Sequence, residues 1–157
     1  MSRRRKIEKH VGQAEAITPK QFLGMLSGML PDDSRPVLAY SGLFSIARSI
    51  AVSPETLPSI LLELLLEAVG SDRTLLMPAY TTGYMNGFLD LDDQPCNTGM
   101  MNELLRKKPA SRRTASAFFS FVAYGAQAGE VASLRPVDAW GQRSLFEWVE
   151  QHDAHIL

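Results

Sequence analysis

The sequence has little of what several classes of protein require. Its one cysteine, Cys96, leaves no partner for a disulfide within the chain, which is typical of proteins in a reducing compartment. Sixteen lysines and arginines nearly balance seventeen acidic residues, for a formal net charge of −1. No overall field therefore favours nucleic acid or an anionic membrane surface. The composition predicts a cytoplasmic protein without a nucleic-acid partner.

Long apolar runs are also missing. The longest, over residues 60–69, is interrupted by Glu63 and Glu67, which we expect to be exposed, and it is too short to cross a bilayer. The basic start of the chain is followed by mostly polar residues, unlike a signal peptide. We expect no membrane partner, a flexible basic arm over residues 1–16 and one α/β domain over 17–157.

No set of His, Cys, Asp and Glu residues has the spacing of metal ligands, and no phosphate-loop or dinucleotide fingerprint is present. The sequence therefore predicts no metal site. Cys96 is interpreted as a structural thiol, with an acyl-carrying nucleophile as the alternative.

Helices are indicated by caps and by apolar periodicity. Thr18 is a hydroxyl N-cap before a proline, and the apolar residues that follow predict a helix that ends before Pro31. Ser53 and the next proline repeat this pattern ahead of a helix that ends at Gly70. Shorter helices are predicted over 99–107, with Met100, Met101, Leu104 and Leu105 on the core side, and over 144–152. We expect His152 and His155 to lie exposed in a frayed tail.

Short apolar runs predict strands over residues 35–40, 74–78 and 117–123. A helix between the first two indicates a right-handed βαβ unit. The turn over residues 41–45 leaves the carboxyl end of the first strand, where ligands gather in open parallel sheets. Residues 80–99 form a long segment without periodicity, and such loops are commonly functional.

Two of these segments resemble the aminoglycoside 3-N-acetyltransferases, a family of acyl-CoA-dependent enzymes. Residues 74–81, TLLMPAYT, are similar to a strand and turn of that family, and residues 40–45 are similar to its HSSLSS turn. Six further positions keep the register of a family pattern without a gap: Asp90, Pro95, Gly99, Glu103, Arg106 and Pro109. The resemblance covers roughly residues 17–146. It implies an αβα layered α/β fold, incomplete at its C-terminus because family members continue well beyond this length.

The resemblance also implies an activity. The family transfers an acetyl group from acetyl-CoA to an amino group of an aminoglycoside or a related aminosugar, in antibiotic resistance or in polysaccharide biosynthesis. The residues expected to face the coenzyme are Ser41, Gly42, Leu43, Ser45, Arg113 and Thr114. Those expected to face the amine are Tyr80, Thr81, Asp90 and Glu103.

One step of the family pattern differs here. An R-S-x-H-P step becomes residues 113–117, so that Ser116 and Ala117 replace a histidine and a proline. Histidine suits a general base because its pKa lies near neutrality, and loss of a general base costs roughly 10²- to 10⁴-fold in rate. The catalytic candidates that remain are Ser116, which could orient the reactants, and Asp90, which could act as a base.

Two interpretations therefore stay open. The first is an N-acetyltransferase-like enzyme that acts on an aminosugar. The second is a catalytically inactive or truncated family member that serves as a binding or structural subunit. In either case an incomplete sheet would expose a strand edge, and such edges favour association, so we expect a homo-oligomer.

Overall fold

The computed structural model describes residues 16–81 and 90–157, so the arm predicted at the N-terminus lies almost wholly outside the described residues. The described elements, in chain order, are α1 (Pro19–Met29), β1 (Val37–Leu38), α2 (Leu43–Ile46), α3 (Leu57–Val69), β2 (Thr74–Pro78), α4 (Met100–Arg106), β3 (Arg112–Arg113), β4 (Phe121–Gly125), α5 (Ala128–Ser133), α6 (Leu145–Gln151) and β5 (His155–Ile156). None of the helices in these two stretches is both long enough and apolar enough to span a membrane.

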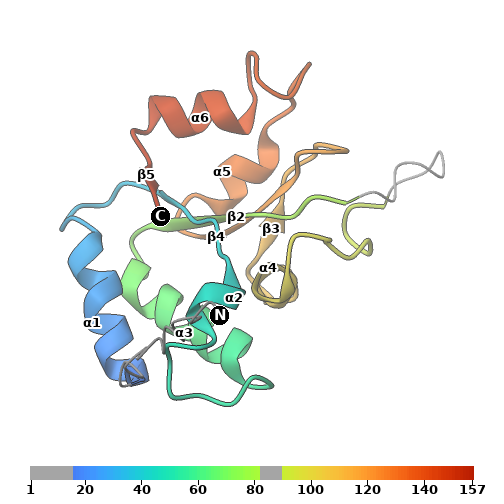
Figure 1. The fold of residues 1–157 in the computed structure, drawn as a ribbon. Coiled ribbons are helices and arrows are strands. Elements are labelled where there is room, and N and C mark those ends of the chain that lie inside the picture. Colours follow the sequence, from blue (N-terminus) through green and yellow to red (C-terminus); the bar gives the residue numbers. More distant parts are fainter. Residues whose placement is uncertain (1–15, 82–89) are drawn as a thin grey trace, which may run out of the picture.

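The strands form one mixed sheet in the order β3-β4-β2-β1-β5 (Figure 1). β1 runs parallel to β2, with Val37 opposite Leu75, and α3 lies between them in the chain, as the predicted βαβ unit requires. β5 also pairs parallel with β1, whereas β4 is antiparallel to both β2 and β3. The carboxyl ends of β1 and β2 therefore meet at the same edge of the sheet.

Helices cover both faces of the sheet because successive strand residues point to opposite sides. Val37, Leu75 and Met77 pack in a cluster with residues of α1, α3 and α4. Leu76 and Phe121 pack in a second cluster with residues of α5 and α6. The α/β fold with αβα layers predicted from the sequence is confirmed.

The start of α1 is confirmed, whereas that of α3 differs from the prediction. Thr18 and Gln21 form a reciprocal capping box at the start of α1. α3 begins at Leu57 with Pro58 in its first turn, where a missing N–H costs nothing. Ser53 lies in the turn before it and offers its carbonyl oxygen to the Leu57 amide. At its other end α3 stops at Gly70, as predicted, and the φ of 78° at this residue favours glycine, although its ψ of 177° differs from that of a left-handed helical cap.

The core side predicted for α4 is half wrong. Met101 and Leu105 are buried as expected, but Met100 and Leu104 are 60% and 38% exposed. Asn102 is buried in their place because its amide donates to a backbone carbonyl at the end of β2. The predicted strand over 117–123 also begins later, at Phe121. α5 and the two-residue strand β3 were not predicted.

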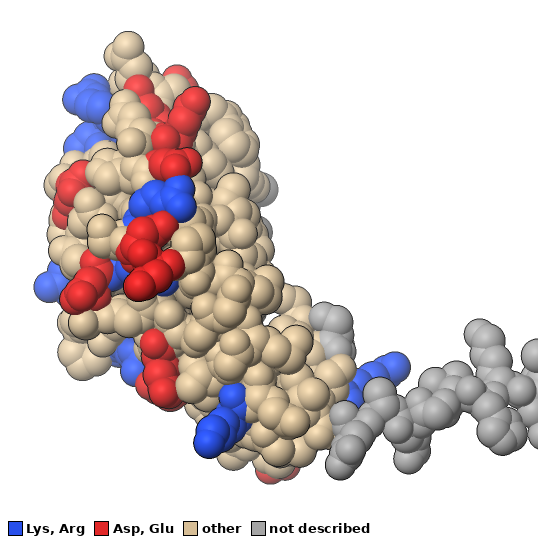
Figure 2. Space-filling model, turned by 90° about the vertical axis from the view of Figure 1, so that its left-hand side faces the viewer, with Lys and Arg blue, Asp and Glu red and all other residues tan. Residues whose placement is uncertain are grey.

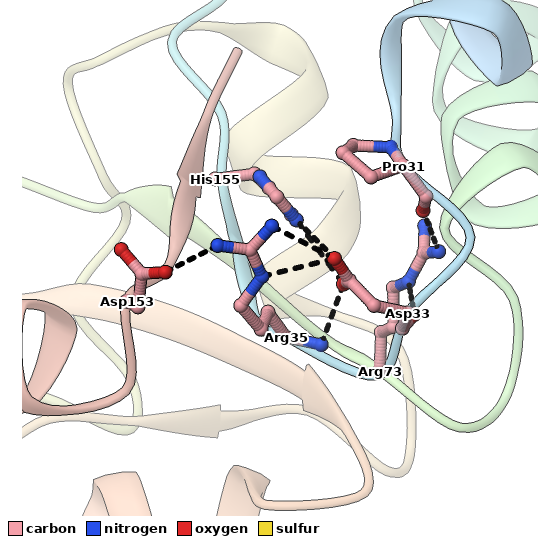
Figure 3. A network of polar contacts seen from close by, with 6 residues as sticks. All are labelled: Pro31, Asp33, Arg35, Arg73, Asp153 and His155. Carbon is pink, nitrogen blue, oxygen red and sulfur yellow. Dashed lines mark hydrogen bonds and ion pairs between the residues drawn. The ribbon is translucent and has the colours of Figure 1, made fainter.

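The expectation of a frayed C-terminal tail was wrong. β5 pairs with β1, and the His155 side chain, 16% exposed, places Nε2 3.1 Å from both carboxylate oxygens of Asp33 (Figure 3). Arg35 binds the same carboxylate and holds the pKa of Asp33 well below its usual range. His152 is half-buried and stacks on Trp148, with ring centroids 4.0 Å apart.

The network around Asp33 also fixes the turn before β1. Arg35 pairs with Asp153 as well as with Asp33, so one guanidinium joins the start of β1 to the segment before β5 (Figure 3). Arg73, just before β2, donates to the backbone carbonyls of Pro31 and Asp33. These contacts lie at the amino ends of β1 and β2, opposite the edge at which ligands are expected.

Surface charge agrees with the small net charge. Figure 2 shows the side of the molecule on which α1 lies, with acidic and basic side chains next to each other and uncharged areas between them. Glu63 and Glu67 on α3 are exposed as predicted, and Glu63 pairs with Lys108 at 2.9 Å.

Candidate functional site

The turn after β1 lies beside the segment that follows β2. Tyr40 ends the first strand region and Tyr80 the second, and a hydrogen bond joins their side chains. Burial, together with this bond, raises the pKa of Tyr80 well above its usual range. Tyr80 is thus a neutral phenol at physiological pH, able to orient a ligand but not to act as a base. Thr81, which follows it, is buried.

The turn over residues 41–43 borders two hollows. One, of about 410 Å³, lies between this turn and the start of α4, and its lining includes Ser41, Gly42, Leu43, Thr98, Gly99 and Met100. The other is a cavity of about 160 Å³ on the α1 and α3 side, which Ser41 and Gly42 also line. The 98–100 segment and this turn therefore line the same hollow. Ser45 lies in α2, and its side chain falls outside the described part of the structure.

Two residues that sequence analysis did not single out hold this segment in place. Thr98 Oγ1 and Asn102 Nδ2 each lie 2.6 Å from the carbonyl oxygen of Pro78, the last residue of β2. The amide oxygen of Asn102 is buried and accepts no hydrogen bond from the described residues. The spacing of Thr98 and Asn102, four apart around the start of a helix, is the only sequence signal that could have found them.

Arg113 is committed to contacts within the chain. Its guanidinium donates to Leu91 O at 2.9 Å, Gln94 O at 2.6 Å and Ser120 Oγ at 3.1 Å, and also to the carbonyl oxygen of Ala79. Burial lowers the pKa of Arg113 below its usual value, but an arginine remains charged. Four of its five N–H groups thus tie the segment before α4 to the end of β2 and the start of β4.

Thr114 and Ser116 lie in the loop between β3 and β4. Thr114 is buried and exchanges hydrogen bonds with the backbone of Phe121 at 2.9 Å, through its own N–H and its hydroxyl. Ser116 is half-buried beside Thr114 and lines a hollow of about 10 Å³ against α6. A space of this size holds no more than one water molecule. The described histidines, 152 and 155, lie in α6's cap and β5 and supply no base to this loop.

Asp90 is exposed and caps a turn. Its Oδ1 accepts from the backbone amides of Asp92 and Asp93, at 3.0 and 3.4 Å. These are the contacts of a capping carboxylate in solvent.

Glu103 is held by cations and by a backbone amide. It pairs with Arg106 through both carboxylate oxygens, at 2.8 Å each, and Oε2 accepts from the Cys96 amide at 3.1 Å. Led by the Arg106 hydrogen bonds, these contacts lower the pKa of Glu103 to about 2, which makes it a poor base. Burial raises the pKa of the half-buried Cys96 thiol, which disfavours a reactive thiolate.

Within residues 16–81 and 90–157, no group of three or more His, Cys, Asp and Glu side chains is placed to hold a metal ion. The residues that line the larger hollow carry no charged side chain.

Comparison with known proteins places this geometry in a family. The sequence model of the aminoglycoside 3-N-acetyltransferases matches residues 45–157. No curated protein sequence matches the chain significantly.

Three solved structures share the fold. Apo aminoglycoside acetyltransferase AAC(3)-IVa is 26% identical, with a TM-score of 0.74 over 92% of this chain and 55% of that one. AAC-VIa bound to sisomicin is 22% identical, with a TM-score of 0.73 over 90% and 58%. AAC-IIIb with CoASH is 19% identical, with a TM-score of 0.68 over 87% and 57%. This chain thus spans less than two thirds of the length of these proteins. On the match over residues 45–157, the chain belongs to the aminoglycoside 3-N-acetyltransferase family.

Proposed function

We propose that this protein transfers an acetyl group from acetyl-CoA to an amino group of an aminoglycoside or a related aminosugar. The observation that carries the proposal is the hollow of about 410 Å³ between the turn over residues 41–43 and the 98–100 segment. Membership of the family supports it, as do the CoASH held by AAC-IIIb and the sisomicin held by AAC-VIa. We also propose antibiotic resistance as the role and the cytoplasm as the location.

The turn that follows β1 is proposed to receive the thioester. Ser41, Gly42, Leu43 and Ser45 would face the coenzyme, with backbone N–H groups of the turn directed at the oxygen on which negative charge develops. Arg113 and Thr114 were predicted to contact the coenzyme directly. Their contacts support a different part, because Arg113 holds the segment before α4 and Thr114 holds the loop between β3 and β4, and we propose both as positioning residues.

The amine is proposed to enter from the side of the segment that follows β2. Tyr80 and Thr81 would orient the aminosugar, and Asp90 would attract its positive charge. Glu103 was predicted to contact the amine directly, but both of its carboxylate oxygens bind Arg106. We propose instead that Glu103 acts indirectly, by holding the segment before α4 in place.

The chemistry then proceeds without a strong base from the described residues. The neutral amine nitrogen attacks the thioester carbon and the carbonyl oxygen becomes an oxyanion. On collapse the C–S bond breaks, and the coenzyme A thiolate leaves and takes up the proton lost by the nitrogen. The neutral hydroxyl of Ser116 is far too weak a base to take a proton from an ammonium group. The rate should therefore follow the unprotonated fraction of the amine and rise about tenfold per pH unit below the amine pKa.

Thiol release from acetyl-CoA, measured from pH 6 to 9 with a panel of aminoglycosides and simpler aminosugars, tests the proposal. We expect slow turnover that increases with pH. Ser116→His should raise the rate most near neutral pH, by roughly 10²-fold or more if the imidazole reaches the amine, whereas the matched Ser116→Ala should leave it unchanged. The proposal fails if neither wild type nor Ser116→His exceeds the background.

The alternative function is a catalytically inactive or truncated family member that serves as a binding or structural subunit. One observation favours it: Ser116 stands where the family pattern has its histidine. It predicts that coenzyme A raises the melting temperature of wild type and Ser116→His alike, with turnover in neither. If coenzyme A shifts neither, the binding role falls as well.

We further propose that the protein is a homo-oligomer. Within the described residues β3 and β5 are the outer strands of the sheet, and Ile156 on β5 is 73% exposed. Unpaired strand edges favour association. Light scattering coupled to size exclusion should give at least twice the monomer mass of 17.4 kDa, and a monomer at micromolar concentration would contradict this proposal.

A further inference from the structure

The cavity of about 160 Å³ under the turn after β1 has an apolar lining. Side chains from four helices form its walls: Phe22 and Leu26 of α1, Ile46 of α2, Leu61 and Leu65 of α3, and Met101 of α4. Leu26, Leu61, Leu65 and Met101 are 8% exposed or less. None of the side chains that line this cavity is charged. Its walls are therefore of the kind that forms a hydrophobic core.

Such a space is unusual inside a domain. Protein interiors are close-packed and contain few voids larger than a water molecule. Water gains little here because it needs two to four polar partners, and the walls below the rim supply none. A designed cavity of about 150 Å³ with a similar lining stays dry and binds benzene. This cavity therefore suits an apolar group of about six carbon atoms.

The rim of the cavity is polar and reaches the surface. Tyr40 is 49% exposed and Gly42 is exposed, and both line the cavity together with Ser41. Ser41 and Gly42 also line the larger hollow in which we place the thioester. One ligand can therefore lie across the turn, with its polar part in the hollow and an apolar tail in the cavity.

We propose that the cavity binds the acyl chain of a coenzyme A thioester longer than acetyl, with about four to six carbons. This inference rests on the proposed function only for the identity of the donor as a coenzyme A ester. An aminosugar does not fit the cavity, because its hydroxyl and ammonium groups would lose their hydrogen bonds to water there.

Chain-length dependence follows from the burial of methylene groups. Each methylene moved from water into an apolar site strengthens binding by about fourfold. Hexanoyl-CoA has four methylenes more than acetyl-CoA, which sets an upper limit of roughly 200-fold. Since part of this is lost in ordering the chain, we expect hexanoyl-CoA to bind about 10- to 100-fold more tightly than acetyl-CoA.

Calorimetry on the full chain with coenzyme A, acetyl-CoA, butyryl-CoA and hexanoyl-CoA tests this directly. The dissociation constants should fall in that order from acetyl to hexanoyl. Leu26→Phe, which enlarges a wall residue, should remove the dependence on chain length and leave the affinity for coenzyme A itself unchanged. Met25→Phe is the matched control, because Met25 is on the same helix, is 55% exposed and does not line the cavity.

Two further measurements keep the inference testable in all cases. Ile46→Phe narrows the cavity from α2, so it replaces Leu26→Phe if that variant does not fold. The hexanoyl thioester of N-acetylcysteamine carries the acyl chain without the nucleotide. Suppose that this short thioester binds, that Leu26→Phe or Ile46→Phe abolishes its binding, and that coenzyme A does not bind. The cavity assignment then stands and the proposed function fails. If coenzyme A binds and all its esters bind equally well, or hexanoyl-CoA binds worst, the cavity assignment is refuted.

Discussion

Replacement of Arg113 by alanine is the sharpest test of how the candidate site is held together. Two of its acceptors, the carbonyl oxygen of Ala79 and the hydroxyl of Ser120, belong to fully buried residues at the meeting point of β2 and β4. The other two, the carbonyl oxygens of Leu91 and Gln94, belong to half-buried residues of the segment before α4. Water can replace the arginine readily at the second pair but not at the first.

The magnitude follows from this difference. A hydrogen bond to a charged group contributes about 1.5–3 kcal/mol, so the two bonds at buried acceptors set a scale of about 3–6 kcal/mol. Ser120 Oγ also donates to Ala79 O at 2.7 Å, which leaves that carbonyl with one partner after the substitution. The substitution also removes the cost of burying the charged guanidinium, which offsets a further part of the lost stability. We therefore expect Arg113→Ala to lower the free energy of unfolding by about 2–4 kcal/mol.

Urea unfolding at pH 7, followed by far-UV circular dichroism, measures this change. Arg112→Ala is the matched control on the same strand, because Arg112 is exposed and its guanidinium donates to the carbonyls of the nearby Pro109 and Ser111. Its substitution should change stability by less than about 0.5 kcal/mol. Arg113→Lys should retain little of the stabilisation, since an ammonium group cannot reach four separate acceptors. A loss below about 1 kcal/mol for Arg113→Ala would refute the structural assignment.

Three further predictions concern other parts of the fold. Gly125 has a φ of 113° and a Cβ there would collide with the carbonyl oxygen of Arg73, so Gly125→Ala should destabilise the protein by roughly 2 kcal/mol or more in the same urea assay. Gly129 in α5 is the control, because it has open space around it and Gly129→Ala should be neutral or stabilising. The folded pKa of Glu103, about 2, is below its ordinary value of 4.5, so the stability that this carboxylate provides is present above about pH 4.5 and lost as the pH falls towards 2. Glu103→Gln should therefore make the urea midpoint depend less on pH between pH 5 and 2.5, and an unchanged pH dependence would count against this assignment. His155→Ala should speed hydrogen exchange of the β5 amides selectively, and uniform exchange across the sheet would show that this side chain does not secure the strand.

The sequence predicts well those features that neighbouring residues decide. The cap of α1 depends on Thr18 and Gln21, three residues apart, and the end of α3 depends on Gly70 alone. β2 is recognisable as a compact apolar run, and all five of its residues are buried. The rule that ligands gather at the carboxyl ends of parallel strands singled out the 41–43 turn, which borders a hollow in the structure.

Features that depend on distant partners were not predictable in this way. β3 and β5 are two residues each, and no periodicity can be read from so short a strand. His155 lies in a strand because β5 pairs with β1. Its imidazole contacts the carboxylate of Asp33, which is 122 positions away in the chain. The same holds at the site. From the sequence, an arginine at position 113 indicates a ligand with phosphate groups, whereas in the structure its guanidinium binds four acceptors within the chain.

These contacts explain how a family pattern can persist without its histidine. Glu103 and Arg106 stand at pattern positions and bind each other, and Arg113 from the next step of the pattern holds the same segment from the other side. Each of these residues stabilises the loop over the hollow whether or not a base is present. Ser116, in contrast, occupies a small space against α6, where a change of side chain disturbs few contacts. Similarity to the family over this part of the chain therefore indicates that the contacts of Glu103, Arg106 and Arg113 around the hollow are kept. Whether the hollow still supports catalysis is tested by the Ser116→His experiment.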